Sequence, residues 1–140
     1  MREVTLYRLE KARATFHEGE QLEALELEDS VVNRFYYSVF HAARALLSTK
    51  DIEPSKHSGV MAVFNKEFVK TGIVSVKASK TFTEVFSMRN QADYTDFVNF
   101  TKEEVSQIKE KAQVFIKEIA DILAGENEQA FSLGEDEHEL

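Results

Sequence analysis

Two oppositely charged residues, Arg89 and Asp93, stand where the surrounding helical pattern calls for apolar side chains. At 100° per residue, Phe82, Phe86 and Phe97 fall on one arc about 60° wide, and both charged residues lie inside that arc. Burying two ions is costly unless close contacts compensate, whereas an exposed ion pair contributes less than about 1 kcal/mol. The pattern therefore predicts a polar crevice between helices or a subunit interface, and the alternative is an ion pair at the rim of the core.

A second group of residues, which combines cationic and aromatic side chains, falls opposite the apolar stripe of the preceding helical segment: Arg34, Tyr37, His41 and Arg44. A surface of this composition can hold a phosphate and stack a base. An ordinary solvated helix face is the alternative. If the surface is functional, the adjacent Tyr36 and Tyr37 should point inward and outward, respectively.

Other catalytic chemistry finds little support in the sequence. His57 lies at core spacing with Met61 and Phe64, which favours a structural histidine over a catalytic one. No pair of histidines has the helical spacing of metal ligands, and no glycine-rich phosphate loop or Ser or Cys nucleophile motif occurs. We therefore expect no metal and no cofactor, and any enzyme here would be built from Arg, Tyr and His.

Apolar spacing predicts five helices that position these residues. Gly19 would weaken the first helix and allow a break, and Asp29 or Ser30 would cap the second. The predicted helices run from about residue 3 to the mid-20s, from about 29 to the segment before Pro54, from Ser55 to Gly72, from about Ser75 to Asp96, and from Lys102 to Gly125.

The start of the fifth helix carries the strongest local signal. Thr101 and Glu104 have the spacing of a capping box, and Phe100 and Val105 occupy the two positions of a hydrophobic staple. The helix that follows presents one apolar face up to Gly125. This signal predicts that the fifth helix begins at Lys102.

The composition favours one all-α domain, an antiparallel up-and-down bundle of about five helices. The chain has 140 residues, 43% of them hydrophobic, with five Gly, one Pro and no Cys. No signal peptide or membrane span is recognisable, so we expect a cytoplasmic protein. The formal net charge is −8, and six acidic residues lie in 126–140 without any Lys or Arg. We expect residues 1–125 to form the bundle and 126–140 a mobile acidic tail.

Three motifs follow one another along the chain: VVNRFYYSVFHAARALL at 31–47, EPSKHSGVMAVFNKEFVKTG at 53–72 and MRNQADYTDF at 88–97. Together they resemble the HEPN superfamily of small helical-bundle proteins. The similarity is greatest to short stand-alone bacterial and archaeal members whose second helix carries Asn-Arg-x-Tyr-Tyr and whose fourth ends in Ala-Asp-Tyr-x-Asp-Phe. The resemblance covers about residues 30 to 120.

This resemblance implies a homodimer with a cleft along the dimer axis, and often a minimal nucleotidyltransferase as partner in a toxin–antitoxin pair. Several members are metal-independent endoribonucleases whose signature pairs an Arg with a His a few residues later. Arg89 matches that Arg, but Tyr94 stands in place of the His. Tyrosine, whose pKa is about 10, is a poor base at neutral pH. Cleavage would therefore need the imidazole of His41 or His57. In some relatives the partner nucleotidyltransferase modifies a tyrosine that follows this His, and Tyr94 is only loosely comparable to that tyrosine.

Three hypotheses follow. The first is a dimeric HEPN protein that binds nucleotide or RNA phosphate in an interfacial cleft around Arg89, beside a nucleotidyltransferase subunit. The second is an active endoribonuclease toxin, and the third is a non-catalytic interaction module in which Arg89 and Asp93 fix the dimer register. The candidate catalytic residues are Arg89, Tyr94 and His41, and the candidate binding residues are Arg34, Tyr37, Arg44, Asn90, Asp93 and Asp96.

Overall fold

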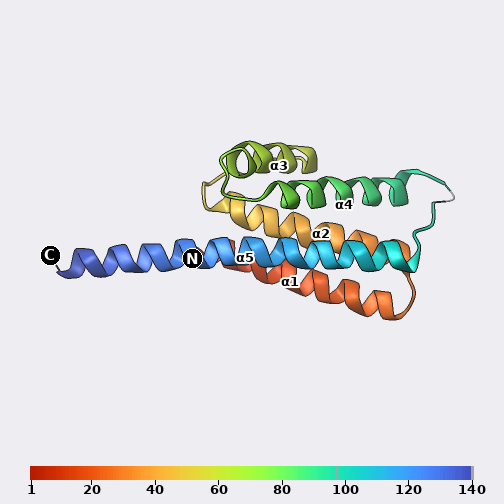
Figure 1. Ribbon diagram of the computed structural model, residues 1–140, viewed down its shortest axis with the longest axis horizontal. Helices are drawn as coiled ribbons and strands as arrows, with labels where there is room; N and C mark the ends of the chain where they lie inside the picture. The colour runs from red at the N-terminus through yellow and green to blue at the C-terminus, as the bar shows by residue number, and fades with distance from the viewer. Residues whose placement is uncertain (97, 140) are drawn as a thin grey trace.

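Helix α2 (Glu28–Ser48) is the centre of the structure and contacts each of the other helices. The computed structural model describes residues 1–96 and 98–139, and the side chains of 1–96 and 98–125. Figure 1 shows α1 on one side of α2, the pair α3 and α4 on the other, and α5 alongside. Within the described residues the chain forms five α-helices and no strand: α1 (Glu3–Ala24), α2, α3 (His57–Phe64), α4 (Val76–Tyr94) and α5 (Lys102–Glu139). The predicted all-α bundle is confirmed.

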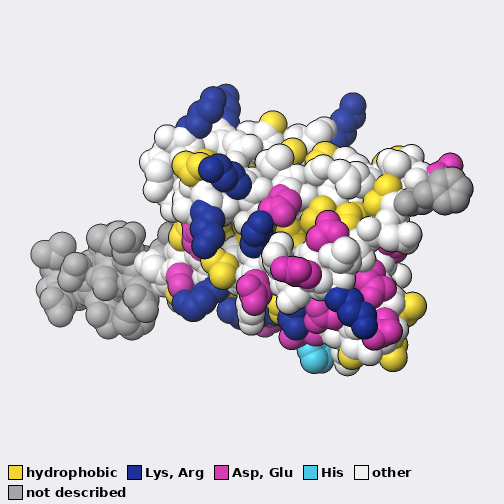
Figure 2. All heavy atoms as spheres, turned by 45° about the vertical axis from the view of Figure 1, so that its right-hand side comes forward, with side chains coloured by type: hydrophobic (Ala, Val, Ile, Leu, Met, Phe, Trp, Pro, Cys, Tyr) yellow, Lys and Arg dark blue, Asp and Glu magenta, His cyan; other side chains and the backbone are white. Residues whose placement is uncertain are grey.

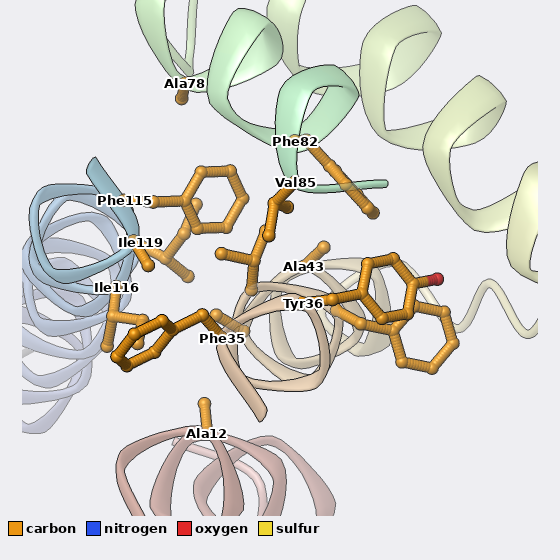
Figure 3. Packing of buried hydrophobic residues seen from close by; sticks show 14 of the residues in the cluster. Ala12, Phe35, Tyr36, Ala43, Ala78, Phe82, Val85, Phe115, Ile116 and Ile119 are labelled. Atoms are coloured by element: carbon orange, nitrogen blue, oxygen red, sulfur yellow. The ribbon is translucent and has the colours of Figure 1, made fainter. Parts of the chain in front are cut away.

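The predicted apolar stripe of α2 forms the core. Figure 3 shows Phe35 and Tyr36, neighbours in the sequence, pointing to opposite sides of α2, where different helices cover them. Both side chains are fully buried, because α2 has packing partners on several sides. The buried residues of the stripe are Val32, Phe35, Tyr36, Val39, Ala43, Leu46 and Leu47.

Helix α1 does not break at Gly19, because this residue lies at the contact between α1 and α2. A Cβ atom at Gly19 would lie 2.7 Å from Cε1 of Phe35, closer than two carbon atoms can approach. The glycine is buried and lies inside a continuous helix. Close packing of two helices therefore explains the residue that the sequence suggested as a break.

The predicted starts of α2 and α3 were wrong by one or two residues. Helix α2 begins at Glu28, its N-cap is Leu27, and no side chain caps it. Glu28 and Asp29 lie in the first turn of α2, where their negative charges interact favourably with the positive end of the helix dipole. Helix α3 begins at His57 rather than Ser55 and continues into a π-helical turn at Asn65–Val69. Gly72, with φ of +80°, follows this segment as expected.

Helix α5 begins at Lys102 as predicted, and both hydrogen bonds of the capping box are present. The backbone N–H of Glu104 donates to Oγ1 of Thr101 at 3.0 Å, and the N–H of Thr101 donates to Oε1 of Glu104 at 3.1 Å. Phe100 and Val105 are both buried, as a hydrophobic staple requires. Two reciprocal hydrogen bonds thus fix the point at which the chain enters α5.

Residues 126–140 carry the predicted acidic tail, and their side chains lie outside the described residues, as does Phe97. Helix α5 does not end at Gly125, which is helical, as the bounds Lys102–Glu139 show. Among the helices described, none combines the length and the apolar character that crossing a membrane would require.

Candidate functional site

Arg89 lies on the side of α4 that faces α2, against two tyrosine rings. Its Cζ is 5.2 Å from the centre of the Tyr36 ring and 5.7 Å from that of the Tyr37 ring. The side chain is 18% exposed. At these distances a guanidinium is attracted to the faces of aromatic rings. Arg89 is therefore held in the seam between α2 and α4 and does not extend into solvent.

The ion pair predicted between Arg89 and Asp93 is present, but it leaves the guanidinium largely unbonded. Nε of Arg89 lies 3.0 Å from Oδ2 of Asp93, yet the pair lacks hydrogen-bond geometry and Nε is buried. Among the described residues, the other two guanidinium nitrogens also have no hydrogen-bond partner. Since a buried donor without an acceptor costs about 1–3 kcal/mol, this arrangement is suited to an acceptor from outside the chain.

An aromatic cluster of α2 and α3 surrounds this seam. The ring of His57 is centred 4.3 Å from that of Phe40 and 5.9 Å from that of Tyr36. Tyr37 packs edge-on against Tyr36 at 5.0 Å and lies 6.0 Å from His41. Tyr36 points inward as predicted, but Tyr37 is half-buried in the cluster and does not extend outward from it.

His57 is joined to the cluster by a hydrogen bond as well as by packing. The hydroxyl of Tyr36 lies 3.0 Å from Nδ1 of His57. Burial, together with the positive charges of Arg89 and Arg44, lowers the pKa of His57 below its usual value. Burial also raises the pKa of Tyr36, so its hydroxyl stays protonated at neutral pH. His57 is therefore a neutral imidazole at physiological pH.

His41 is neutral for a similar reason. Burial, followed by the charges of Lys11, Arg44 and Arg34, lowers its pKa to about 4. Its Nδ1 is buried and has no hydrogen-bond partner in the described part of the chain. His41 contacts the Tyr37 and Phe40 rings, so it lies at the edge of the same cluster.

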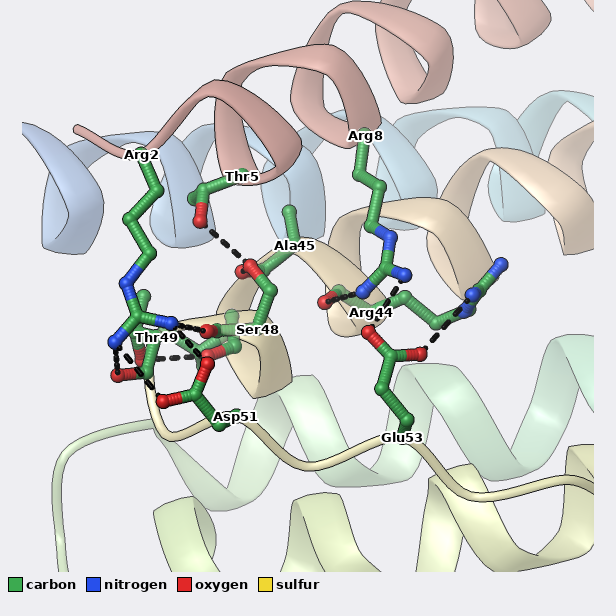
Figure 4. A network of polar contacts seen from close by, with 10 residues as sticks. Arg2, Thr5, Arg8, Arg44, Ala45, Ser48, Thr49, Asp51 and Glu53 are labelled. Carbon is green, nitrogen blue, oxygen red and sulfur yellow. Dashed lines mark hydrogen bonds and ion pairs between the residues drawn. The ribbon is translucent and has the colours of Figure 1, made fainter.

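The two arginines of α2 flank the cluster and are already engaged by acidic side chains. Arg34 bonds Glu18 at 3.3 Å, and its Cζ lies 5.5 Å from the Tyr37 ring centre. Arg44 bonds Glu53 at 3.4 Å, and its Cζ lies 5.9 Å from the ring centre of Phe40. Figure 4 shows Glu53 between Arg44 and Arg8. Both arginines are half-buried, so they do not lie on the solvated helix face that was the alternative interpretation of the sequence.

Tyr94 and Asn90 line a different part of α4. They border an open hollow, and Tyr94 is 79% exposed. Tyr94 follows Arg89 by five residues, which places the two about 140° apart around a helix. No contact in the described part of the molecule joins them, and Asp96 lies beyond the end of α4. Within one chain, Arg89 is thus grouped with Tyr36, Tyr37 and His57, and not with Tyr94. The other residues that line the hollow are Thr83, Phe86, Ser87, Gln91 and Thr95.

Sequence reasoning underestimated Tyr36 and His57 as members of this site. Both lie at core spacing, and the contact between them joins residues 21 positions apart. The available signal was that His57 opens a short helix whose apolar stripe must face α2. Because His57 is the first residue of this apolar stripe, it lies at the rim of the core.

The surface charge is mixed. On the face shown in Figure 2, Lys and Arg side chains are interspersed with Asp and Glu over the centre and lower part, whereas those that project from the upper edge have no acidic side chain beside them. A nucleic-acid contact would therefore be local, as the composition also indicates.

Comparison with known proteins agrees with the fold and with the motifs that form this cluster. The chain is 37% identical over 130 residues to a Methanocaldococcus jannaschii protein named "Putative toxin MJ0142", which covers 89% of this chain and 88% of that protein. It is 39% identical over 113 residues to a Thermotoga maritima protein named "UPF0332 protein", covering 81% and 86% of the two chains. A second M. jannaschii protein, "Putative toxin MJ0605", is 37% identical over 94 residues, covering 67% and 69%.

The family model described as "HEPN domain" matches residues 5–123, which include all the described residues of the cluster between α2, α3 and α4. The match thus spans the bundle from α1 to the described part of α5. This protein belongs to the HEPN domain family.

Proposed function

We propose that this HEPN protein is the toxin-like member of a toxin–antitoxin pair, and that it binds the phosphate of RNA or of a nucleotide at Arg89. In this proposal two copies form a homodimer, the seam around Arg89 opens into the cleft between them, and a minimal nucleotidyltransferase is the partner. Two relatives whose names describe toxins support the toxin-like role.

The observation that carries the proposal is the unbonded guanidinium of Arg89. The Arg89 side chain is 18% exposed and pairs with Asp93 and two tyrosine rings, yet its buried Nε has no hydrogen-bond acceptor among the described residues. A phosphate supplies several acceptor oxygens and a negative charge, and an arginine can bind it in bidentate fashion. The adjacent ring of Tyr37 offers a surface on which a base can stack.

The dimer is tested by sedimentation equilibrium of the wild-type protein at micromolar concentration. The proposal expects a mass twice that of the 16.0 kDa chain. A monomer at these concentrations would contradict a composite cleft. A variant with Arg89→Ala should retain the dimer if Arg89 serves the ligand, whereas loss of the dimer with unchanged RNA binding would favour the interaction module.

An endoribonuclease is the second candidate function, and the neutral imidazole of His57 in the same cluster favours it. Induced expression of the wild-type protein should then arrest growth, and Arg89→Ala should relieve the arrest at equal protein level. Where a neighbouring reading frame encodes a nucleotidyltransferase, its co-expression should protect the cells. Harmless expression of the wild-type protein, together with no cleavage of a mixed RNA pool, would exclude this candidate.

A further inference from the structure

His57 and Arg89 lie against the same two tyrosine rings, although they belong to different helices. The His57 ring centre lies 5.9 Å from that of Tyr36 and 5.8 Å from that of Tyr37. Cζ of Arg89 lies 5.2 Å and 5.7 Å from the same two ring centres. His57 begins α3, and Arg89 lies in the last part of α4. The fold therefore brings an imidazole and a guanidinium to one aromatic pair on α2.

The hydrogen bond between Tyr36 and His57 has only one arrangement of protons that satisfies both residues. Tyr36 is fully buried, and Nδ1 of His57, at 3.0 Å, is the one partner of its hydroxyl among the described residues. If the hydroxyl accepted from Nδ1–H, its own proton would be buried without an acceptor, which is unfavourable. The hydroxyl therefore donates, Nδ1 accepts, and the single N–H of the neutral imidazole is at Nε2.

The Nε2–H group of His57 is open to a ligand. No residue in the described ranges bonds this nitrogen, and the His57 side chain is only partly buried. Two side-chain nitrogens in the described part of the chain are both buried and unbonded, Nδ1 of His41 and Nε of Arg89. Since Nε2 of His57 has no partner and is not one of these, it is accessible. His57 thus presents a donor at the edge of the seam.

Arg89 adds further donors beside this imidazole. Its two terminal guanidinium nitrogens have no hydrogen-bond partner in the part of the chain that the structure describes. Burial, followed by the charges of Arg89 and Arg44, lowers the pKa of His57, so the imidazole stays neutral. Together the two side chains offer several N–H donors and one positive charge. Such a set is complementary to an oxyanion whose oxygens carry no proton.

The carboxylate of Asp93 limits the charge of the anion that this set can hold. Oδ2 of Asp93 lies 3.0 Å from Nε of Arg89, and the Asp93 side chain is 36% exposed. The two arginines of α2 that flank the cluster are likewise paired with glutamates. One guanidinium beside a carboxylate suits a ligand with a single negative charge, because Asp93 would repel a second charge on the ligand.

We propose that His57 is a phosphate-binding residue whose Nε2–H donates, together with Arg89, to the non-bridging oxygens of one phosphodiester, and that Asp93 disfavours phosphates with two negative charges. Tyr36 is the positioning residue, because its hydroxyl fixes the proton of His57 on Nε2. The inference rests on the proposed function and narrows it. The ligand is an internal phosphodiester of single-stranded RNA, and not the terminal phosphate of a nucleotide.

The position of the imidazole proton can be observed directly by ¹⁵N NMR of the labelled full-length protein near neutral pH. The spectrum distinguishes a protonated ring nitrogen from an unprotonated one, and the signals missing in His57→Gln identify His57. We expect Nε2 to be protonated and Nδ1 unprotonated in the wild-type protein. Tyr36→Phe should give a mixture of both tautomers. A wild-type His57 with its proton on Nδ1 would overturn the donor role.

The contribution of His57 to affinity is measured with one short single-stranded RNA that has no terminal phosphate. His57→Phe removes the donor and keeps a ring, and it should weaken binding about 10-fold. His57→Gln, whose amide can donate, should recover most of this loss. His17→Gln, at a position of α1 that is 69% exposed, should bind as wild type. Wild-type affinity in folded His57→Phe would overturn the assignment.

Circular dichroism establishes that the variants are folded. If His57→Phe does not fold, the double variant Tyr36→Phe with His57→Ala takes its place, because it leaves no buried hydroxyl without an acceptor. The same loss of about 10-fold is expected, and wild-type affinity would again overturn the assignment.

A matched pair of small ligands tests the charge limit set by Asp93. AMP and its methyl ester differ by one methyl group and, at a pH of about 8, by one negative charge, since the second pKa of a phosphate monoester is about 6. We expect the wild-type protein to bind the methyl ester at least about threefold more tightly than AMP. Asp93→Asn should reduce this preference, and Asp121→Asn on α5 should retain it. Equal or tighter binding of AMP by the wild-type protein would overturn the preference for a diester.

Failure of this inference is distinguishable from failure of the proposed function. If Arg89→Ala weakens RNA binding while His57→Phe and Asp93→Asn have no effect, the roles of His57 and Asp93 are removed and phosphate binding at Arg89 stands. If the wild-type protein binds neither the RNA nor the methyl ester, the proposed function is removed as well.

Discussion

Two arginines with similar burial, Arg8 and Arg89, differ in what surrounds them. Arg8 is 12% exposed, lies 2.7 Å from Oε1 of Glu53 and donates to the carbonyl of Arg44 at 3.3 Å. Arg89 is 18% exposed, contacts the rings of Tyr36 and Tyr37, and has an ion pair without hydrogen-bond geometry. Removing Arg8 would leave hydrogen-bonded acceptors without their donor, whereas removing Arg89 would break no hydrogen bond of the described residues. The proposed ligand role of Arg89 depends on this contrast.

Replacement by methionine, which keeps the length of the side chain and removes the charge, should reveal this difference. Arg8→Met should lower the free energy of unfolding by about 1–2 kcal/mol, because Glu53 and a backbone carbonyl lose their donor. Arg89→Met should change it by less than about 1 kcal/mol or raise it. Urea denaturation measures both variants. A loss of more than about 2 kcal/mol in Arg89→Met would show that Arg89 is structural.

The buried imidazole of His41 should make stability depend on pH. Its pKa is about 4 in the folded chain, below the value of about 6.5 in an unfolded chain. Between these values the unfolded state binds more protons, so the free energy of unfolding should fall as the pH drops from about 6.5 to 4. His57 contributes in the same direction. Urea denaturation at several pH values gives the free energy of unfolding as a function of pH. Between pH 4 and 6.5 this free energy should change less with pH for His41→Gln than for wild type. An equal pH dependence in the two proteins would contradict the burial of His41.

At the scale of elements, the paired helices α1 and α2 depend on the absence of a side chain at Gly19. Alanine there is favoured by helix propensity by about 1 kcal/mol, but its Cβ would lie 2.7 Å from Phe35. Gly125 is the matched comparison, since it is helical and a Cβ atom there would meet no atom of the described residues within 4 Å. The two glycines thus test packing and propensity separately.

Gly19→Ala should lower the free energy of unfolding by about 1–3 kcal/mol, because Phe35 and the helix that carries it must move. Gly125→Ala should raise it by up to about 1 kcal/mol. Thermal or urea denaturation distinguishes the two. Stabilisation by both substitutions would mean that α1 and α2 pack less closely at Gly19 than its contact with Phe35 indicates.

Local patterns predicted most of the elements, and contacts between elements explain the rest. The stripe of α2 and the capping box at Thr101 are set by residues within one or two turns, so their spacing suffices to find them. The uncapped start of α2 at Glu28 and the continuity at Gly19 depend on neighbouring helices. The candidate site divides in the same way: Arg89 stands out from its own helix, whereas its neighbour His57 is defined by packing across α2 and α3.

At the scale of the whole molecule, the charge distribution limits how nucleic acid can bind. The formal net charge is −8, and acidic and basic side chains are mixed over the centre and lower part of the face in Figure 2. An acidic protein does not coat an RNA backbone through broad attraction. Binding should depend on a few phosphates near Arg89 and its aromatic neighbours, with base stacking as the second contribution.

The salt dependence of RNA binding tests this limit. Each phosphate neutralised on single-stranded RNA contributes about −0.7 to the slope of log K against log salt concentration. We expect a slope of about −1 to −2 for the wild-type protein and a shallower slope, by about 0.7, for Arg89→Ala. Fluorescence anisotropy with a labelled oligonucleotide gives both values. A slope steeper than about −4 would indicate an extensive electrostatic interface instead.

The most direct test of the account is the affinity of wild type, Arg89→Ala and Arg13→Ala for one single-stranded RNA oligonucleotide, measured by isothermal titration calorimetry. Arg13 lies on the α1–α5 side of the bundle, so its replacement removes the same charge away from the cluster. We predict binding at least 10-fold weaker for Arg89→Ala, about 1.4 kcal/mol, and within about twofold of wild type for Arg13→Ala. Equal affinities of all three proteins would contradict phosphate binding at Arg89.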